Sequence, residues 1–124
     1  MYALVTGSNG FIGKHLVQRL QENGFGVTEM DIPCDITKKA YWQIKLHNID
    51  YVFHLAGYLD NYGEEMDFSK YADVNIKSIA LMFEVIVKDG SPRKIKKVII
   101  ASSQSVYGEG LYLKDLPLPE KEDD

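Results

Sequence analysis

The stretch TGSNGFIG at residues 6–13 decides the fold of this 124-residue chain. A short apolar run, YALV at residues 2–5, precedes it, and apolar residues at helical spacing follow it. A buried strand, a glycine turn and a helix are therefore expected in this order. In such a turn Gly7 permits the sharp bend, Gly10 lets the backbone approach a pyrophosphate, and Gly13 lets the helix pack closely on the strand. The spacing predicts a dinucleotide of the NAD type at the helix N-terminus.

A phosphate-binding loop of the nucleoside-triphosphatase type is the alternative, because Gly13-Lys14 resembles the end of that motif. The first glycine of the motif would fall on Ser8. His15 stands where a serine or threonine would hold magnesium. The sequence therefore excludes this alternative.

Strand and helix patterns alternate along the rest of the chain. Strands are expected at residues 2–6, 26–30, 50–55 and 96–102, and helices from the glycine turn to Asn23-Gly24, from an N-cap at Thr37 to about His47, and from about Phe68 to Lys88. This alternation predicts an α/β fold with a Rossmann-type doubly wound parallel sheet. The expected strand order is 3-2-1-4, with the ligand crevice at the carboxyl ends where strands 1 and 4 diverge. Residues 1–113 are expected to form a partial nucleotide-binding domain, and the Pro-rich, acidic residues 114–124 a linker or frayed tail.

The composition excludes several classes of partner. A net charge of −4 and a pI near 5.3 leave no basic surface for nucleic acid or for an anionic membrane. No apolar run approaches the ~20 residues of a membrane helix. The single cysteine, Cys34, cannot form an internal disulfide, so a cytoplasmic protein is expected. His15 and His47 have no partner at metal-ligand spacing, and no metal site is expected.

Asp31 closes the second expected strand and is the candidate ligand for the adenosine ribose. Its carboxylate can accept hydrogen bonds from both ribose hydroxyls and would repel a 2′-phosphate, and no arginine flanks it. NAD is therefore preferred over NADP. The alternative is that Asp31 only forms the turn after the strand.

The chain resembles the extended short-chain dehydrogenases that act as NAD-dependent sugar-nucleotide epimerases and dehydratases, among them UDP-glucose 4-epimerase-like proteins and their dehydratase relatives. Four segments carry the resemblance in the family's order: residues 6–13, Asp35-Ile36, HLAG at 54–57, and SSQSVYG at 102–108. The resemblance implies that this chain is the N-terminal portion of such an enzyme, which transfers hydride from a nucleotide-sugar hydroxyl to NAD.

The resemblance also implies roles for individual residues. Phe11 and Ile12 would contact the pyrophosphate through backbone amides, and Asp35-Ile36 would border the adenine. The full set implied to bind the cofactor is Gly7, Asn9, Gly10, Phe11, Ile12, Gly13, Asp31, Asp35, Ile36, Leu55, Ala56, Gly57, Asn75 and Ser102. For Asn75, which matches the family's helix-opening asparagine, a purely structural role is equally open. His54 is expected to be structural.

Ser103 falls where the family places its catalytic serine, which hydrogen-bonds the substrate oxygen; the alternative is a polar cap at the end of a strand. The family's proton-transfer pair, Tyr-x-x-x-Lys, does not follow it in this sequence. The one such spacing, Tyr41 to Lys45, lies upstream on the adenine side. We therefore expect no catalysis by this chain alone. The second interpretation is a noncatalytic dinucleotide-binding or interaction module.

The helix expected at about Phe68–Lys88 is apolar around most of its circumference. Val74, Ser78, Leu81 and Val85 form the stripe that would cover the sheet, and further apolar residues lie outside it. Such a helix needs a second partner. Relatives often dimerise through the corresponding helix, which favours a homodimer. Cover by a C-terminal portion of the same protein is the alternative.

Overall fold

The computed structural model describes residues 1–59, 67–88, 94–103 and 106. Its elements follow one another as β1 (Tyr2–Thr6), α1 (Phe11–Glu22), β2 (Gly26–Met30), α2 (Lys39–Lys45), β3 (Tyr51–His54), α3 (Phe68–Ala72), the π-helical segment η1 (Asp73–Lys77), α4 (Ser78–Lys88) and β4 (Lys97–Ile100). The expected strands are all present, the third and fourth slightly shorter than expected. Residues 114–124 and the boundary at residue 113 lie outside the described part.

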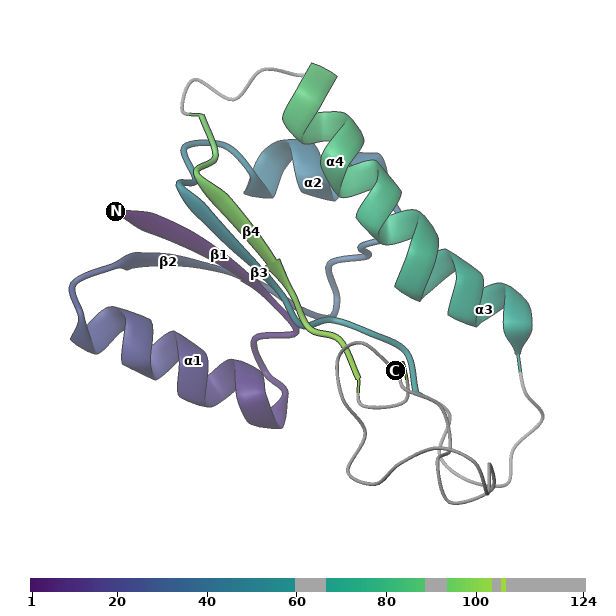
Figure 1. Ribbon diagram of the computed structural model, residues 1–124, viewed down its shortest axis with the longest axis horizontal. Helices are drawn as coiled ribbons and strands as arrows, with labels where there is room; N and C mark the ends of the chain where they lie inside the picture. Colours follow the sequence, from purple (N-terminus) through teal and green to yellow (C-terminus); the bar gives the residue numbers. More distant parts are fainter. Residues whose placement is uncertain (60–66, 89–93, 104–105, 107–124) are drawn as a thin grey trace, which may run out of the picture.

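The four strands form one parallel sheet in the order β2-β1-β3-β4 (Figure 1). At the carboxyl end of β1, Thr6 is in register with Met30 of β2 on one side and with His54 of β3 on the other. The α/β fold with a doubly wound parallel sheet is thus confirmed. The expected order 3-2-1-4 is wrong, because the third strand pairs directly with β1 and no strand pairs with the outer edge of β2 among the described residues.

The reversal at β1 places the helices on opposite faces of the sheet (Figure 1). Right-handed crossovers that run in opposite directions along a parallel sheet cover opposite faces. One face packs on α1, and its buried residues are Ala3, Val5, Val17 and Leu20. The other face packs on α2 and α4, and its fully buried residues include Leu4, Trp42, Val52 and Met82. The chains leaving β1 and β3 therefore diverge, which opens a crevice between these two strand ends.

The start of α2 differs from the expectation. The N-cap of α2 is Lys38, which makes no side-chain capping hydrogen bond, so the expected cap at Thr37 is wrong. Thr37 instead donates from its backbone N–H and from its Oγ1 to Asp35 Oδ1, at 2.9 and 2.7 Å. Both donors of Thr37 are thus directed at the aspartate two residues upstream, in a turn that precedes the helix.

The long helix expected at residues 68–88 is formed over that range with a π-helical segment in its middle. Asp67 caps it by accepting a hydrogen bond from the backbone N–H of Lys70, at 3.0 Å from Oδ1. Within α4 the buried residues are Ser78, Met82 and Val85, so Met82 belongs to the sheet-facing stripe with two of the expected residues.

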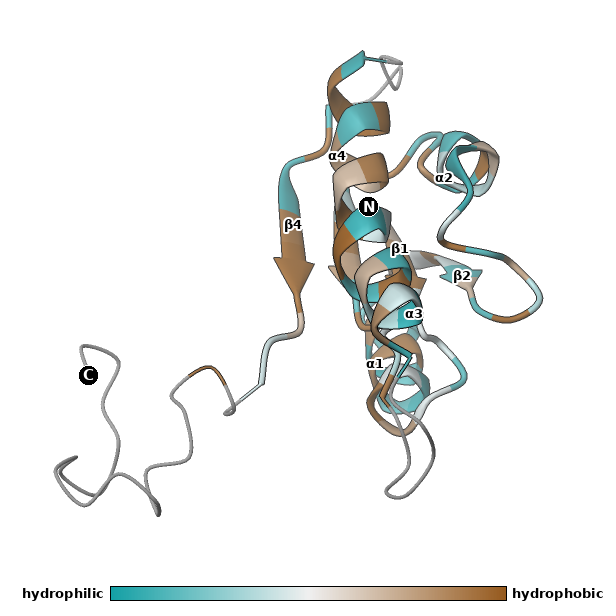
Figure 2. Cartoon of the chain, turned by 90° about the vertical axis from the view of Figure 1, so that its right-hand side faces the viewer, coloured by the Kyte–Doolittle hydropathy of each residue, from teal (hydrophilic) through white to brown (hydrophobic). Residues whose placement is uncertain are grey.

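Apolar residues lie on the outward side of this helix as well (Figure 2). Ile76, Phe83 and Val87 are 69%, 42% and 78% exposed. They lie at spacings of seven and four residues, so they share one helical face. We call Ile76, Phe83 and Val87 the outer apolar face. None of the described helices is long and apolar enough to cross a membrane.

Candidate functional site

The glycine turn joins β1 to α1 through a tightly packed backbone. Gly7 has φ +67°, and a Cβ built on it would lie 2.9 Å from the backbone nitrogen of Ala56. A Cβ on Gly13 would lie 2.1 Å from the carbonyl oxygen of Gly7 and 2.8 Å from Ser8 Cα. Any side chain at Gly13 would collide with backbone atoms, so this glycine is required for packing. The interpretation of Gly7 and Gly13 from their spacing agrees with this geometry.

The N-terminus of α1 points its polar groups at the carboxyl edge of the sheet. Its N-cap is Gly10, which has no side chain to cap the helix, and its first turn holds no acidic residue. The first backbone N–H groups of a helix have no partner within the helix and lie at the positive end of its dipole. Phe11 and Ile12 supply two of these groups, while their side chains are exposed to solvent. The arrangement is suited to an anion such as a phosphate.

Asp31 is tied to the glycine turn. Its Oδ2 accepts a hydrogen bond from the backbone N–H of Asn9 at 2.7 Å, and its Oδ1 accepts one from the N–H of Ile32 at 2.8 Å. A carboxylate has about four acceptor positions, so two remain for a ligand. Asp31 is therefore more than a turn former, because it also sets where the glycine turn lies relative to the end of β2.

Asp35 and Ile36 lie beyond Asp31 along the same edge. The two hydrogen bonds from Thr37 to Asp35 hold the pKa of that carboxyl below its usual range. Asp35 is therefore ionised at neutral pH, and both hydrogen bonds from Thr37 go to its Oδ1. Ile36 is buried in the core, and its carbonyl oxygen accepts a hydrogen bond from Trp42 Nε1 at 2.8 Å.

Thr6 joins the carboxyl ends of β1 and β3. Its Oγ1 lies 2.8 Å from His54 Nδ1 and accepts hydrogen bonds from the backbone N–H groups of Leu55 and Ala56, each at 3.1 Å. Thr6 and His54 are both buried, and burial lowers the pKa of the His54 imidazole. The expectation that His54 is structural agrees with these contacts.

Asn75 holds the loop after β3 against the helix. Its Oδ1 accepts a hydrogen bond from the backbone N–H of Tyr58 at 2.7 Å, and its Nδ2 donates to the Tyr58 carbonyl at 2.9 Å. A Cβ on Gly57 would lie 3.4 Å from Asn75 Oδ1. Of the two roles left open for Asn75, this geometry favours the structural one, because both ends of its amide bind the protein backbone.

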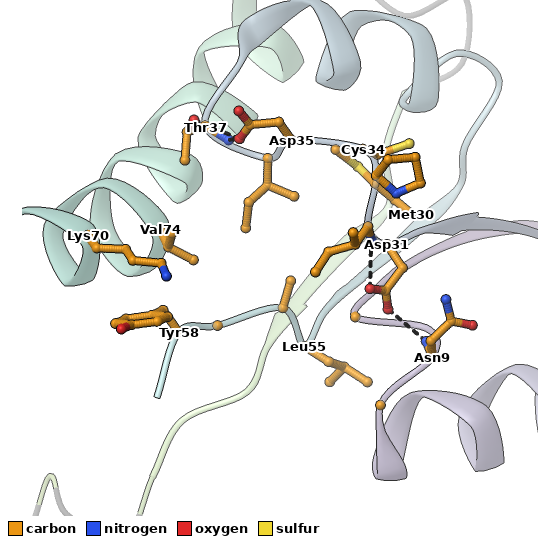
Figure 3. A pocket seen from close by; sticks show the side chains of 17 residues that line it. Asn9, Met30, Asp31, Cys34, Asp35, Thr37, Leu55, Tyr58, Lys70 and Val74 are labelled. Carbon is orange, nitrogen blue, oxygen red and sulfur yellow. Dashed lines mark hydrogen bonds between the residues drawn. The ribbon is translucent and has the colours of Figure 1, made fainter. Parts of the chain in front are cut away.

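A cavity of about 670 Å³ gathers these elements at the carboxyl edge of β1, β2 and β3. Nine of the residues implied to bind a cofactor line it: Gly7, Asn9, Gly10, Asp31, Asp35, Ile36, Leu55, Ala56 and Gly57. Figure 3 shows Asn9 and Asp31 on one side of the cavity and Tyr58 and Lys70 on the other. The implied residues that do not line it are Phe11, Ile12, Gly13, Asn75, Ser102 and Ser103. The volume is in the range of small-molecule sites.

Ser102 and Ser103 follow β4 at the same edge of the sheet. The backbone N–H of Ala101 donates to the His54 carbonyl at 3.0 Å, so the chain leaves the sheet beside the end of β3. Both serines are exposed, and the Ser103 carbonyl accepts a hydrogen bond from the N–H of Val106 at 3.2 Å. They lie after the last strand and outside the cavity lining, so their expected roles stay predictions.

Sequence reasoning missed eight of the seventeen residues that line the cavity, among them Tyr58 and Lys70, which contact each other. The Lys70 ammonium lies 4.1 Å from the centroid of the Tyr58 ring, and the Tyr58 and Tyr71 rings pack edge to face at 5.0 Å. Tyr58 directly follows the HLAG segment and could have been included on that ground. Lys70 comes from a separate helix, and no periodicity in the sequence relates it to the glycine turn. The described residues include no group of three side chains that could hold a metal ion.

The sequence of this chain is similar to those of enzymes that act on nucleotide sugars. The UDP-glucose 4-epimerase of Yersinia enterocolitica is 30% identical over 148 aligned residues, which cover 98% of this chain and 41% of that protein. The UDP-N-acetyl-alpha-D-glucosaminuronate decarboxylase of Bacillus cytotoxicus is 29% identical, with 86% of this chain and 38% of that protein covered. The chain thus spans about two fifths of the length of these relatives.

Solved structures show the same fold. The UDP-glucose 4-epimerase of Thermotoga maritima, solved with UDP-glucose, is 30% identical with a TM-score of 0.70, covering 83% of this chain and 38% of that one. The enzyme of the same name from Bifidobacterium longum, solved with NAD+ and UDP, is 28% identical with a TM-score of 0.69, covering 87% and 38%.

The resemblance found in the sequence motifs is confirmed at the level of the family. The sequence model described as the NAD dependent epimerase/dehydratase family matches residues 3–124, nearly the whole chain. That range includes the glycine turn, Asp31 and the loop after β3, which together line the cavity. The chain belongs to the NAD dependent epimerase/dehydratase family.

Proposed function

We propose that this chain binds the adenosine and pyrophosphate portion of NAD in the cavity above β1, β2 and β3. The observation that carries the proposal is the meeting of the glycine turn, Asp31 and the Leu55–Gly57 segment in one cavity. Relatives solved with NAD, such as the Bifidobacterium longum epimerase, support it. When bound, NAD supplies the hydride acceptor for oxidising a hydroxyl group.

The phosphate end of the ligand fits the N-terminus of α1. Gly10 leaves the backbone open to close approach, and the N–H groups of Phe11 and Ile12 supply donors to the pyrophosphate oxygens. No side chain and no acidic residue of the first turn competes for this position. Because Gly10 has no Cβ, a pyrophosphate can approach the backbone N–H groups closely enough to accept hydrogen bonds from them.

The adenosine end fits the acidic residues farther along the cavity. Asp31 offers its remaining acceptor positions to the ribose hydroxyls. Asp35 offers its Oδ2 to a donor such as the adenine amino group. Ala56, Gly57 and Val74 give the cavity apolar walls for the adenine ring. Lys70 lies on the side of the cavity opposite Asp31, where its ammonium stands over the Tyr58 ring.

Titration calorimetry of the 124-residue chain with ADP-ribose tests the proposal directly. ADP-ribose carries the adenosine and pyrophosphate that this cavity would hold, without the nicotinamide. We expect saturable binding, because groups for the ribose and for the pyrophosphate already meet in this cavity. A chain that is folded by circular dichroism and binds neither ADP-ribose nor NADH contradicts the proposal.

Asp31 is expected to select NAD over NADP. In the Asp31→Asn variant the repulsion of the 2′-phosphate is lost, while one acceptor oxygen and the shape remain. A hydrogen bond to a charged group contributes about 1.5–3 kcal/mol, so the ratio of NAD to NADP affinity should fall by about tenfold or more. Competition against ADP-ribose with each dinucleotide measures the ratio. The control is Glu29→Gln on the exposed side of β2, which should leave it unchanged. An unchanged ratio in Asp31→Asn would count against the ribose assignment.

For the whole protein we infer an epimerase or dehydratase that acts on a nucleotide sugar. The support is the family and the relatives named for UDP-glucose and UDP-N-acetyl-glucosaminuronate. Ser103, at the carboxyl edge after β4, would orient the substrate hydroxyl. A proton acceptor of the Tyr-x-x-x-Lys type does not follow it within residues 104–124.

The 124-residue chain is therefore expected to catalyse no reaction on UDP-glucose, UDP-galactose or dTDP-glucose in the presence of NAD. Ser103 can orient a hydroxyl group, but a proton acceptor is needed to complete hydride transfer. Product analysis after long incubation measures this. Turnover that disappears in the Ser103→Ala variant would contradict the expectation, whereas turnover that persists in this variant would indicate a contaminating enzyme.

The outer apolar face is proposed as the site of homodimer formation. Its three side chains lie on one helical face and would lose contact with water on association. Sedimentation velocity over a concentration series should show self-association, and Phe83→Glu should shift the protein to monomer. The matched control is Lys88→Glu, which changes charge outside the outer apolar face. A monomer at the highest concentration, with its helices intact by circular dichroism, would argue against this surface.

A further inference from the structure

The Thr6 hydroxyl connects the two backbone segments that line the cavity, the glycine turn after β1 and Leu55–Gly57 after β3. Thr6 ends β1 immediately before Gly7, and His54 ends β3 immediately before the Leu55–Gly57 wall. Three groups surround Thr6 Oγ1 within hydrogen-bonding distance: His54 Nδ1 and the backbone nitrogens of Leu55 and Ala56. These groups come from the end of β3 and the two residues after it, 48 to 50 residues away in the sequence, so the contacts hold the two strand ends together.

The direction of the contact to His54 follows from counting donors. A hydroxyl has one hydrogen to donate and two lone pairs to accept with. The N–H groups of Leu55 and Ala56 both donate to Thr6 Oγ1, and the Leu55 N–H also donates to the Thr6 carbonyl at 3.3 Å. Of these three contacts, His54 Nδ1 is the one that can accept the hydroxyl hydrogen, and it does so only when that nitrogen carries no proton. His54 is therefore neutral, with its proton on Nε2.

Protonation of His54 at Nδ1 would take the acceptor away from the Thr6 hydroxyl hydrogen and place a further donor beside Thr6 Oγ1. The hydroxyl hydrogen would then be an unpaired donor inside the protein, which is unfavourable and favours a shift of this segment. The contacts at risk hold Leu55 and Ala56. Ala56 also lies against the glycine turn, since its nitrogen is 2.9 Å from the Cβ position of Gly7. A shift of this segment therefore changes the distance between the walls of the cavity.

Among the described residues, no charged group contacts His54 in a way that would stabilise its protonated form. It contacts Thr6 of β1 and the Trp42 ring of α2, whose centroid lies 5.6 Å from its own, and it is in register with Ile100 of β4. The charged residues on the packed helices α2 and α4 and on β4 are Lys39, Lys45, Glu84, Lys88 and Lys97. Lys39 and Lys88 pair with Glu84, and Lys45 donates to the Glu29 carbonyl. Burial is the cause of the lowered pKa of His54.

We propose that Thr6 and His54 form a positioning pair that sets the width of the dinucleotide cavity, and that ligand binding requires His54 in its neutral, Nε2-protonated form. The inference rests on the proposed binding of a dinucleotide in that cavity. Neither residue would touch the ligand, and both act through Leu55, Ala56 and Gly7. Binding is then expected to weaken as the pH falls and His54 takes up a proton.

Substitutions at Thr6 test the positioning role at pH 8, where His54 is neutral. Thr6→Val keeps the shape and the β-propensity of the side chain but removes the hydroxyl. It should lower the affinity for ADP-ribose by about tenfold, equivalent to about 1.4 kcal/mol. Thr6→Ser keeps the hydroxyl and should bind as the wild-type chain does. Equal affinities of the valine and serine variants would overturn the positioning role.

The pH dependence of the affinity for ADP-ribose tests the role of His54 apart from that of the other groups of the site. Between pH 8 and pH 5.5 the affinity of the wild-type chain for ADP-ribose should fall, by up to about tenfold per pH unit below the pKa of His54. His54→Asn keeps an acceptor near the Nδ1 position and should bind with an affinity that does not change over this range. Both are measured in a His15→Gln background, because the His15 Nδ1 lies 2.8 Å from the Phe11 carbonyl oxygen, close to the proposed phosphate position. A wild-type affinity that is constant with pH would overturn the inference.

The free energy of unfolding is expected to decrease as the pH falls, as the affinity for ADP-ribose does, so both are measured over the same pH range. The folded-state pKa of His54 is lowered, so the unfolded chain binds the proton more tightly below its ordinary pKa of about 6.5. The stabilisation is complete above this pH and is lost as the pH falls. Thermal unfolding at each pH therefore defines the range over which the titrations are made on folded protein.

Nitrogen chemical shifts of the imidazole rings give a readout that does not depend on a ligand. In histidine-labelled chain at pH 8, His54, assigned by its loss in His54→Asn, should show an unprotonated Nδ1 and a protonated Nε2. The opposite tautomer would overturn the pair. If the wild-type chain bound no ADP-ribose at pH 8, the proposed function would fail, and the tautomer would still decide whether the Thr6–His54 pair exists.

Discussion

Replacing Gly13 by alanine is expected to destabilise the whole domain and to abolish ADP-ribose binding. The added methyl group would lie 2.1 Å from the carbonyl oxygen of Gly7 and 2.8 Å from Ser8 Cα, closer than non-bonded atoms approach. Both neighbours are backbone atoms, so relief requires that α1 move away from the turn. This movement would open the α1 side of the core, around Val17 and Leu20.

The expected cost of Gly13→Ala is about 3 kcal/mol in the free energy of unfolding, the upper part of the range for overpacking. Urea denaturation followed by circular dichroism measures it. The control is Gly24→Ala, at a position with φ +78° and no atom within 4 Å of the added Cβ. There the cost should be about 1 kcal/mol, from the left-handed backbone alone. If the two variants unfolded at the same urea concentration, the close packing at Gly13 would be refuted.

Replacing Gly10 by valine is expected to abolish ADP-ribose binding while the domain remains folded. Gly10 has φ −69° and ψ 171°, an extended conformation that any residue adopts. It is exposed, lines the cavity, and a Cβ would approach only the Gly7 carbonyl, at 3.2 Å. The side chain would therefore occupy the space in which a pyrophosphate has to meet the helix N-terminus.

The expected loss of affinity for Gly10→Val is more than about 100-fold, or about 2.7 kcal/mol. The free energy of unfolding should fall by about 1 kcal/mol, because valine is a poor N-cap. Calorimetric titration and urea denaturation of the same preparation measure the two effects, and Gly10→Ala should be intermediate in affinity. Retained binding by Gly10→Val would mean that a ligand of this cavity does not approach the turn, and the assignment of the phosphate end would have to be abandoned.

The local features of the site could be predicted because each depends on a few adjacent residues. The glycines at 7, 10 and 13 imply a bend, an open backbone and a close packing contact, and all three lie in a segment of eight residues. Asp31 was placed correctly since it directly follows β2. The nine predicted residues that line the cavity all lie at or just after the carboxyl ends of β1, β2 and β3.

The order of the strands could not be predicted in the same way. An apolar run such as Val52 and its neighbours fits a place beside β2 as well as one beside β1, because both positions are buried on two faces. The choice depends on the direction of the crossover through α2, which no single residue encodes. Lys70 was missed for a related reason, since the packing of α3 near Tyr58 brings it to the cavity. The Thr37 cap was wrong because Thr37 belongs to a turn in which its N–H and hydroxyl donate to Asp35, one residue before the helix N-cap.

The central place of β1 in the sheet has a consequence for the order in which the domain can be assembled during synthesis. Each parallel neighbour of a strand has to wait for a crossover connection. The first such unit, β1-α1-β2, already contains the glycine turn and Asp31, so half of the cavity can form early. Its other face, with Leu4 and Met30, stays uncovered until α2 and α4 have left the ribosome. His54 reaches Thr6 only after 48 further residues, so the second wall of the cavity closes late.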